Sequence, residues 1–252
     1  MSIIRVPYHL DERLPGLDVA LAGDVEEVTV EPPDGDVWTR LASLYDAVAG
    51  AVERTARAGP APVVVSGDCT VSIGIAAGLQ RAGVAPGVVW FDAHGDVQTL
   101  ETTTSGYVGG MALRFLVGYR RSLVADRIGL RPVPEQRVAL VDARDLDPPE
   151  AEYLASARIN KLTVDDLSAD DLPAGPLLVN LDLDIVDPAH VPGLRYPAAG
   201  GPDVTTFLRA ARVVLDTGRV AALNVACTWN PGHADPAGVR QRLVSALVAA
   251  ST

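Results

Sequence analysis

The sequence predicts one α/β domain of the doubly wound type, built on a parallel sheet and covering residues 1–252. Short apolar runs rich in Val and Leu alternate with helix-like segments, and this alternation is typical of parallel sheets covered by helices. A chain of 252 residues can bury one large core, and no linker, repeat or low-complexity block divides it. Both observations favour a single domain.

Five runs are apolar on both faces, as strands buried on both sides are. They cover residues 62–66, 87–93, 137–143, 176–184 and 220–229. Helix-like segments cover residues 37–59, 70–83, 109–118, 148–156, 205–218 and 236–250. We interpret the Pro- and Gly-rich stretch 191–204 as a functional loop. Ligands of open parallel sheets bind at the carboxyl ends of the strands, so the residues at those ends are the candidate site.

The charge and the cysteine content exclude several classes of protein. The chain has 21 Lys and Arg against 32 Asp and Glu, which disfavours nucleic-acid partners because phosphate binding needs clustered positive charge. No uncharged apolar run approaches the roughly 18 residues of a membrane span, and the first residues lack a basic-then-apolar signal region. We therefore expect a soluble, cytoplasmic protein without membrane partners. Cys69 and Cys227, its only cysteines, are expected to be free thiols.

Three polar residues follow the second apolar run with i, i+2, i+4 spacing: Asp92, His94 and Asp96 in WFDAHGD. In an extended segment such residues point to the same side. Two carboxylates and an imidazole on one side suit a hard or borderline divalent cation. A solvated acidic turn after a strand explains this short motif equally well.

Asp182 and Asp184 repeat this logic at the end of the fourth run, in NLDLDIVDP. Two carboxylates there are costly unless a cation or hydrogen bonds compensate. A helix cap and the D-x-D motif of sugar-nucleotide transferases are alternative interpretations. Taken together with the motif on the second run, the pair brings the number of candidate ligands to five, enough to hold two metal ions.

Six motifs together resemble the arginase/agmatinase, or ureohydrolase, family. They are SGDCTVSIG, WFDAHGD, SGYVGGM, ARDLDPPE, NLDLDIVDP and TWNPG, within roughly residues 60–235. The resemblance implies a three-layer α/β/α fold around a central parallel sheet, with a binuclear manganese site at the strand ends. It also implies hydrolysis of C–N bonds in guanidino or formimino compounds.

The resemblance carries over to six candidate metal ligands. They are Cys69, Asp92, His94, Asp96, Asp182 and Asp184. It implies that Asp92 and Asp182 bridge two Mn²⁺ ions and hold the attacking hydroxide between them. The other four ligands would complete the two ions in pairs, Cys69 with Asp96 and His94 with Asp184.

Cys69 stands where the family has a histidine ligand, which is the first departure from its pattern. A thiolate is softer than an imidazole and is not the natural ligand for Mn²⁺, although a nearby cation lowers the pKa of a thiol. We expect Cys69 to bind the metal or to lie next to it, with the metal identity at that position left open. The alternative is a lost ligand and a weak or single-metal site.

Gly109 is the second departure, because the family has a histidine here that acts as acid, base or proton shuttle. That group is absent from SGYVGGM. His190 and His233 lie in other loops predicted to face the site and are possible substitutes, although a lone loop histidine is more often incidental.

Thr228 is the third departure, since arginases and agmatinases have a glutamate here that pairs with the cationic guanidinium. A hydroxyl cannot neutralise a full charge, so the reacting group is expected to be less basic than guanidinium. N-omega-hydroxy-L-arginine fits this expectation. Bacterial ureohydrolases with Cys in the first motif convert it to hydroxyurea and L-ornithine for natural-product biosynthesis, and the chain resembles this group.

The contacts to an α-amino acid persist in the pattern. Asp147 matches the acid that binds the α-amino group, and Ser105 matches a serine that contacts the α-carboxylate. Gln98 replaces an asparagine with the same role. A simple helix cap before PPEAEYL also explains Asp147, and both roles can hold together.

The sequence thus predicts a metal-dependent amidinohydrolase with a small guanidino amino acid as its partner. N-omega-hydroxy-L-arginine is the first substrate, and arginine or another guanidino or formimino acid is the runner-up. A metal-poor binding protein of the same fold and a deacetylase-like single-zinc hydrolase are the alternatives from other classes. Family members are often trimers or hexamers, which leaves a homo-oligomer open.

Overall fold

Eight strands form one sheet in the computed structural model, which describes residues 3–251. The strand order is β4-β1-β5-β10-β9-β6-β7-β8, and all neighbours are parallel. The strands are β1 (Ile3–Val6), β4 (Val25–Glu27), β5 (Val63–Ser66), β6 (Gly87–His94), β7 (Val138–Asp145), β8 (Asn160–Leu162), β9 (Leu177–Asp182) and β10 (Val220–Ala226). A separate antiparallel hairpin consists of β2 (Tyr8–His9) and β3 (Glu12–Arg13). Because the strands of the sheet run the same way, their carboxyl ends share one edge.

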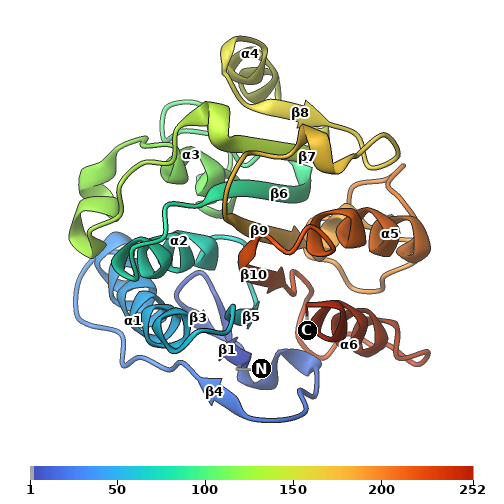
Figure 1. The fold of residues 1–252 in the computed structure, drawn as a ribbon, viewed down its shortest axis with the longest axis horizontal. Helices are drawn as coiled ribbons and strands as arrows, with labels where there is room; N and C mark the ends of the chain where they lie inside the picture. Colours follow the sequence, from blue (N-terminus) through green and yellow to red (C-terminus); the bar gives the residue numbers. More distant parts are fainter. Residues whose placement is uncertain (1–2, 252) are drawn as a thin grey trace.

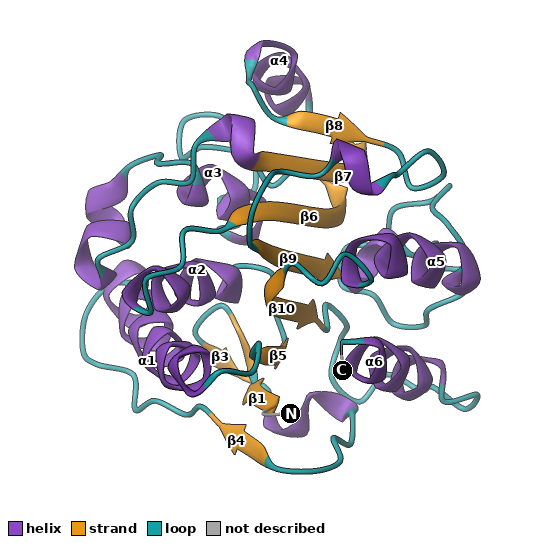
Figure 2. Cartoon of the chain, in the orientation of Figure 1, coloured by secondary structure: helices purple, strands orange, loops and turns teal. Residues whose placement is uncertain are grey.

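Helices cover both faces of the sheet and complete three layers (Figures 1 and 2). On one side lie α1 (Val37–Ala58), α2 (Val71–Arg81) and α3 (Ala112–Leu116), and on the other α5 (Val204–Leu215) and α6 (Val239–Ala250). The remaining helix, α4 (Pro148–Ser156), lies next to β8 at the end of the sheet. The predicted α/β/α fold with a central parallel sheet is confirmed. Among residues 3–251, no helix combines the length and apolar content needed to cross a membrane.

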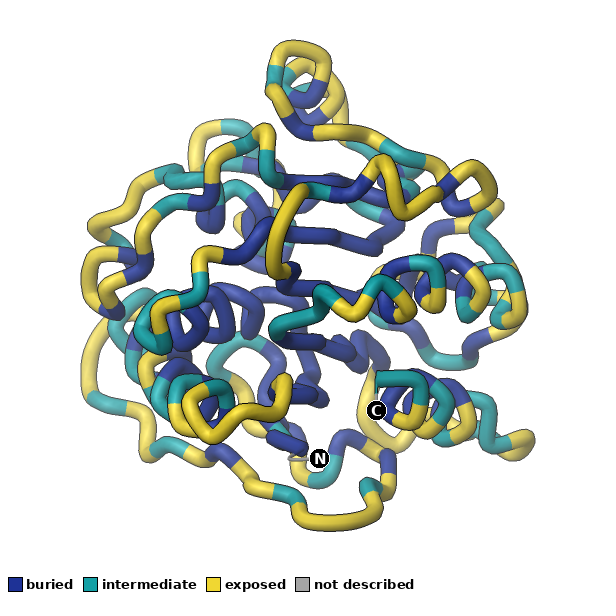
Figure 3. Tube along the Cα trace, in the orientation of Figure 1, coloured by how far each residue is buried: buried dark blue, intermediate teal, exposed yellow. Residues whose placement is uncertain are grey.

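Two apolar cores fill the spaces between the sheet and its helix layers. Trp90 packs into the core that contains Tyr45 of α1, whereas Phe91 meets Phe207 of α5 edge to face at 6.1 Å between ring centroids. Successive residues of a strand point to opposite faces, so β6 supplies both cores. Figure 3 shows the central strands as the most continuously buried part of the chain.

The helix ends and the helix packing follow from local chemistry. The α1 helix begins after Asp36, whose side chain accepts a hydrogen bond of 2.8 Å from the backbone N–H of Thr39. It ends at Gly59, where φ is +113°. Helices α1 and α2 approach closely at Gly78, because a Cβ there would lie 2.6 Å from the backbone oxygen of Ala49. Any larger residue would push the two helices apart.

The five predicted strands are present, with differences at their ends. The run at 176–184 stops as a strand at Asp182, since the Asp182 side chain accepts a 3.0 Å hydrogen bond from Asp184 N–H and begins a 3₁₀ turn. The segment at 109–118 forms only the short helix α3 after a 3₁₀ turn at Gly109–Met111. A single turn is too short to be recognised from the periodicity of apolar residues.

Candidate active site

A cavity of about 390 Å³ opens at the carboxyl ends of the central strands. All six predicted metal ligands line it, and so do the four predicted substrate-binding residues. They are Cys69, Asp92, His94, Asp96, Asp182, Asp184, Gln98, Ser105, Asp147 and Thr228. Segments that are far apart in the sequence therefore meet at one place, as the parallel topology requires.

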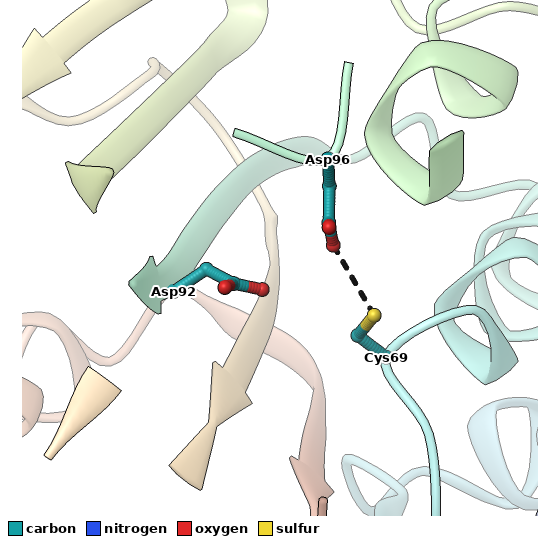
Figure 4. A group of neighbouring side chains, drawn as sticks. All are labelled: Cys69, Asp92 and Asp96. Carbon is teal, nitrogen blue, oxygen red and sulfur yellow. Dashed lines mark hydrogen bonds between the residues drawn. The ribbon is translucent and has the colours of Figure 1, made fainter. Parts of the chain in front are cut away.

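The first potential metal-binding group consists of Cys69, Asp92 and Asp96, whose ligand atoms all lie within 4.8 Å of one another (Figure 4). Cys69 lies in the turn between β5 and α2, and its Sγ donates a hydrogen bond of 3.2 Å to Asp96 Oδ2. All three side chains are buried. The thiol thus points at the carboxylates and not into the apolar core.

The second group consists of Asp92, His94 and Asp184, again within 4.8 Å of one another. His94 Nδ1 lies 3.2 Å from Asp92 Oδ1 and 3.3 Å from Asp184 Oδ2. Asp92 belongs to both groups, so the two groups share one carboxylate. Side chains that share a carboxylate in this way suit two adjacent cations.

Asp182 lies in the same cavity but outside both groups. Its Oδ1 accepts hydrogen bonds from the backbone N–H of Asp184, at 3.0 Å, and from the Thr228 hydroxyl. Asp182 and Thr228 are both buried. These contacts fix the carboxylate at the end of β9.

The spacing rule behind the D-x-H-x-D motif holds only in part. Strand β6 ends at His94, and Asp96 has a left-handed φ of +54°. The expectation of one extended segment is therefore wrong at Asp96. The carboxyl of Asp92 accepts a 2.8 Å hydrogen bond from His94 N–H, and the turn after it sends Asp96 toward Cys69 and His94 toward Asp184.

Burial of several carboxyl groups in one place raises their pKa values. Burial and then the charge of Asp92 raise the pKa of Asp184 to about 6 and raise that of Asp96 well above its usual range. Burial and the charge of Asp184 do the same to the pKa of Asp182. Each shift reports a cost of crowding negative charge away from water.

His94 and Cys69 respond to the same field. Burial lowers the pKa of His94, but its hydrogen bonds with Asp184 and Asp92 outweigh this and raise the pKa to about 12. Burial, followed by the charge of Asp96, raises the pKa of the Cys69 thiol. Carboxylate oxygens and one imidazole dominate this donor set, which fits hard to borderline divalent cations. A cation would also relieve the crowding of negative charge.

Three of the predicted substrate-binding residues, Gln98, Ser105 and Asp147, line the same cavity. Gln98 donates a 2.7 Å hydrogen bond from Nε2 to Asp147 Oδ2 and accepts one of 2.7 Å from the Thr102 hydroxyl. Asp147 is also the residue before the first turn of α4. Ser105 is exposed at the rim. Asp147 thus caps α4, as the simpler interpretation predicted, and also lines the cavity; its contact with an α-amino group stays a prediction.

The two proposed substitute histidines do not reach the cavity. His190 and His233 are exposed, and neither is among the described residues that line the cavity. His233 packs its ring against Gly193, where a Cβ would lie 2.6 Å from its Cγ. Their positions therefore give no support to either residue as a substitute for the group missing at Gly109.

Sequence reasoning missed an aromatic and histidine cluster on the cavity wall. Tyr107 and Tyr196 line the cavity, with ring centroids 4.6 Å apart. Buried His9 stacks on both rings. His9 Nδ1 lies 3.1 Å from Asp68 Oδ2, and His9 Nε2 lies 3.3 Å from the Tyr107 hydroxyl. The only sequence signal for this cluster was the position of Tyr107, two residues before Gly109. Tyr196 belongs to the loop 191–204, so this loop contributes to the cavity wall.

Comparisons with known proteins agree with this geometry. A sequence model of the Arginase family matches residues 2–250. The chain is 31% identical over 242 residues to the arginase of Bacillus caldovelox, with 80% of this chain and 81% of that protein covered. It is 32% identical over 191 residues to the arginase of Eremothecium gossypii, covering 69% of this chain and 48%, about half, of that longer relative.

The crystal structure of arginase from Bacillus cereus superposes on the chain with a TM-score of 0.84 at 25% sequence identity. The superposition covers 99% of this chain and 97% of that one. A family match over residues 2–250 and this likeness in three dimensions show that the chain belongs to the arginase family, whose members are metal-dependent hydrolases acting on amidine C–N bonds.

Proposed function

We propose that the protein hydrolyses the guanidino C–N bond of N-omega-hydroxy-L-arginine to hydroxyurea and L-ornithine, with two Mn²⁺ ions bound. The observation that carries this proposal is Thr228, whose hydroxyl donates to Asp182 at the place where a glutamate would meet a guanidinium. A neutral hydroxyl supplies no charge to a cationic group. An N-hydroxyguanidine is less basic than a guanidine, because its oxygen withdraws electrons.

The two ions would be held by the groups that share Asp92. Cys69 and Asp96 would complete one site, while His94 and Asp184 would complete the other. Asp182, held in place by its two hydrogen bonds, is proposed as the second bridging carboxylate. Bound there, the metal ions would supply an activated water as the nucleophile at neutral pH and would act as Lewis acids.

The amino acid end of the substrate is proposed to contact Asp147 and Ser105, which line the cavity. Asp147 is a suitable partner for the α-amino group, because Gln98 already holds one of its oxygens at 2.7 Å and fixes its orientation. Ser105, at the exposed rim, is a suitable donor to the α-carboxylate. These contacts favour an α-amino acid over a decarboxylated amine such as agmatine.

A product assay tests the substrate. The manganese-loaded protein is given N-omega-hydroxy-L-arginine or L-arginine, and ornithine, hydroxyurea and urea are quantified. We expect kcat/KM to favour the hydroxylated substrate by about tenfold or more, the range that one altered polar contact supplies. A preference for L-arginine would contradict the proposal and favour the arginase alternative.

A matched pair of variants links the preference to Thr228. We expect Thr228→Glu to improve the relative use of L-arginine, because it restores a carboxylate, while Thr228→Ser keeps the wild-type preference. Metal analysis accompanies both variants. A wild-type protein that retains well under one Mn²⁺ per chain would favour the metal-poor binding protein instead.

A further inference from the structure

Gly109 and Tyr107 are sterically linked. A Cβ built at Gly109 would overlap the ring atoms and the hydroxyl oxygen of Tyr107. The ring of Tyr107 therefore fills the space that any side chain at position 109 would need. Both residues line the cavity, and Tyr107 is the polar one of the pair.

A buried chain of hydrogen bonds fixes the orientation of Tyr107. The side chains of His9 and Asp68 are 7% and 0% exposed, and His9 Nδ1 lies 3.1 Å from Asp68 Oδ2. The backbone oxygen of Gly67 lies 3.4 Å from the same nitrogen. Both neighbours are hydrogen-bond acceptors, so in a neutral imidazole the proton lies on Nδ1.

This assignment leaves His9 Nε2 as an acceptor. The Tyr107 hydroxyl, 3.3 Å away, then donates a hydrogen bond to Nε2. Toward the cavity, the phenolic oxygen can then act only as a hydrogen-bond acceptor. The Thr228 oxygen is likewise left as an acceptor, since the Thr228 hydroxyl donates a hydrogen bond to Asp182. Two neutral oxygens on the cavity wall are thus oriented as acceptors.

We propose that the Tyr107 oxygen accepts a hydrogen bond from an N–H or O–H group at the reacting end of the substrate, with His9 and Asp68 as positioning residues. The inference rests on the proposed function and refines its substrate class. A neutral acceptor suits a group that is rich in donors and low in charge, as a hydroxyguanidine is. The Tyr107 side chain occupies the space on the cavity wall that a side chain at position 109 would need.

The test compares single and double variants of the manganese-loaded protein. We expect Tyr107→Phe, which keeps the ring and removes the oxygen, to lower kcat/KM for N-omega-hydroxy-L-arginine about tenfold. His9→Gln should lower it to a smaller extent. Since His9 acts through the Tyr107 oxygen, His9→Gln should cause no further loss in the Tyr107→Phe background.

Two controls separate this contact from a structural effect. Affinity for L-ornithine, which lacks the reacting group, should be unchanged in Tyr107→Phe when measured by calorimetry. Tyr153→Phe removes a tyrosine hydroxyl that bonds to Glu135 outside the cavity, and should leave kcat/KM unchanged.

Each outcome decides a separate question. An active wild type with kcat/KM unchanged in Tyr107→Phe overturns the contact. Equal losses from His9→Gln in both backgrounds overturn the positioning role. A manganese-loaded wild type that hydrolyses neither N-omega-hydroxy-L-arginine nor L-arginine overturns the proposed function, and this inference with it.

Discussion

Among single residues, Cys69 has the most specific chemistry. Its thiol is buried, has a raised pKa and donates a hydrogen bond to Asp96. A metal ion that binds this sulfur must displace that proton. Once the cation is present it stabilises the thiolate, so the same residue is protonated without metal and suited to coordination with metal.

We predict that Cys69→Ala lowers the metal content of the protein, whereas Cys227→Ala leaves it unchanged. Cys227 is the matched control, because it is also a buried free thiol but packs in the core on the other side of the sheet. Elemental analysis measures the content, and a thiolate-to-metal absorption band in the cobalt-substituted protein reports the bond. Equal metal content in the two variants, with no such band, would show that Cys69 does not bind metal.

The overlap between Gly109 and Tyr107 gives a second prediction. Gly109→Ala should lower the free energy of unfolding by about 1–3 kcal/mol, as overpacking does, and Tyr107→Gly should remove most of this cost. Gly110→Ala is the control, since a Cβ there meets only Gln98 Cγ at 3.8 Å. Denaturant unfolding is measured for the wild type, the three single variants and the double variant Gly109→Ala/Tyr107→Gly. The overlap is refuted if Gly109→Ala is as mild as Gly110→Ala.

Site residues that stand close together in the sequence could be predicted, whereas those that meet from distant positions could not. The carboxylates of the two acid motifs stand close together in the chain and next to apolar runs, so pattern alone identified them. His9 and Tyr107 are separated by 98 positions, and neither has a neighbour in sequence that explains it. Their meeting depends on how the loops fold over the strand ends, which residue spacing does not encode.

Among the elements, β5, β9 and β10 are joined by a polar network below the cavity. Asn224 donates to Asn180 Oδ1 at 2.9 Å and to Ser72 Oγ at 3.1 Å, and accepts 2.8 Å from Ser66. All four side chains are completely buried. Buried networks of this kind orient the strands to which they belong. Two of these strands carry Asp68 and Thr228 just beyond their ends, and the third, β9, ends at Asp182.

We predict that Asn224→Ala destabilises the protein by about 3 kcal/mol, because it removes three buried hydrogen bonds of about 1 kcal/mol each. Asn160→Ala is the control, as Asn160 is exposed on the edge strand β8 and should cost less than about 0.5 kcal/mol. Chemical denaturation gives both values. Similar costs would show that the network contributes little.

The predictability of strands depended on their place in the sheet. The five central strands are apolar on both faces and were predicted from that property. Strands β4 and β8 were missed because an edge strand is short and partly polar, as VEE and NKL are. Strand β1 was missed although it is buried, since IIRV is only four residues long and precedes a proline.

For the whole molecule, crowded acids at the cavity couple stability to pH and to metal. The pKa of Asp184 is about 6 in the folded chain against about 3.9 when unfolded. Between these values the folded state holds more protons, so the stability that this group provides is present at low pH and lost as pH rises. The raised pKa values of Asp96 and Asp182 have the same sign.

We therefore predict that the unfolding temperature of the metal-depleted protein falls between about pH 4 and pH 6, the window set by Asp184. Manganese should reverse this trend, because metal and protons compete for the same carboxylates. Thermal unfolding with EDTA or with excess Mn²⁺ measures both curves. A metal-free protein that becomes more stable across this window would contradict the assignment.

The position of β10 in the centre of the sheet has a consequence for biosynthesis. It lies between β5 and β9 although it is the last strand of the sheet in the chain. During synthesis on the ribosome, β5 and β9 cannot be joined in one sheet until residues 220–226 emerge and insert between them. Pairings of such long sequence separation form slowly. We expect the group of Cys69, Asp92 and Asp96 to come together only after β10 has inserted, since β10 and β9 lie between β5 and β6.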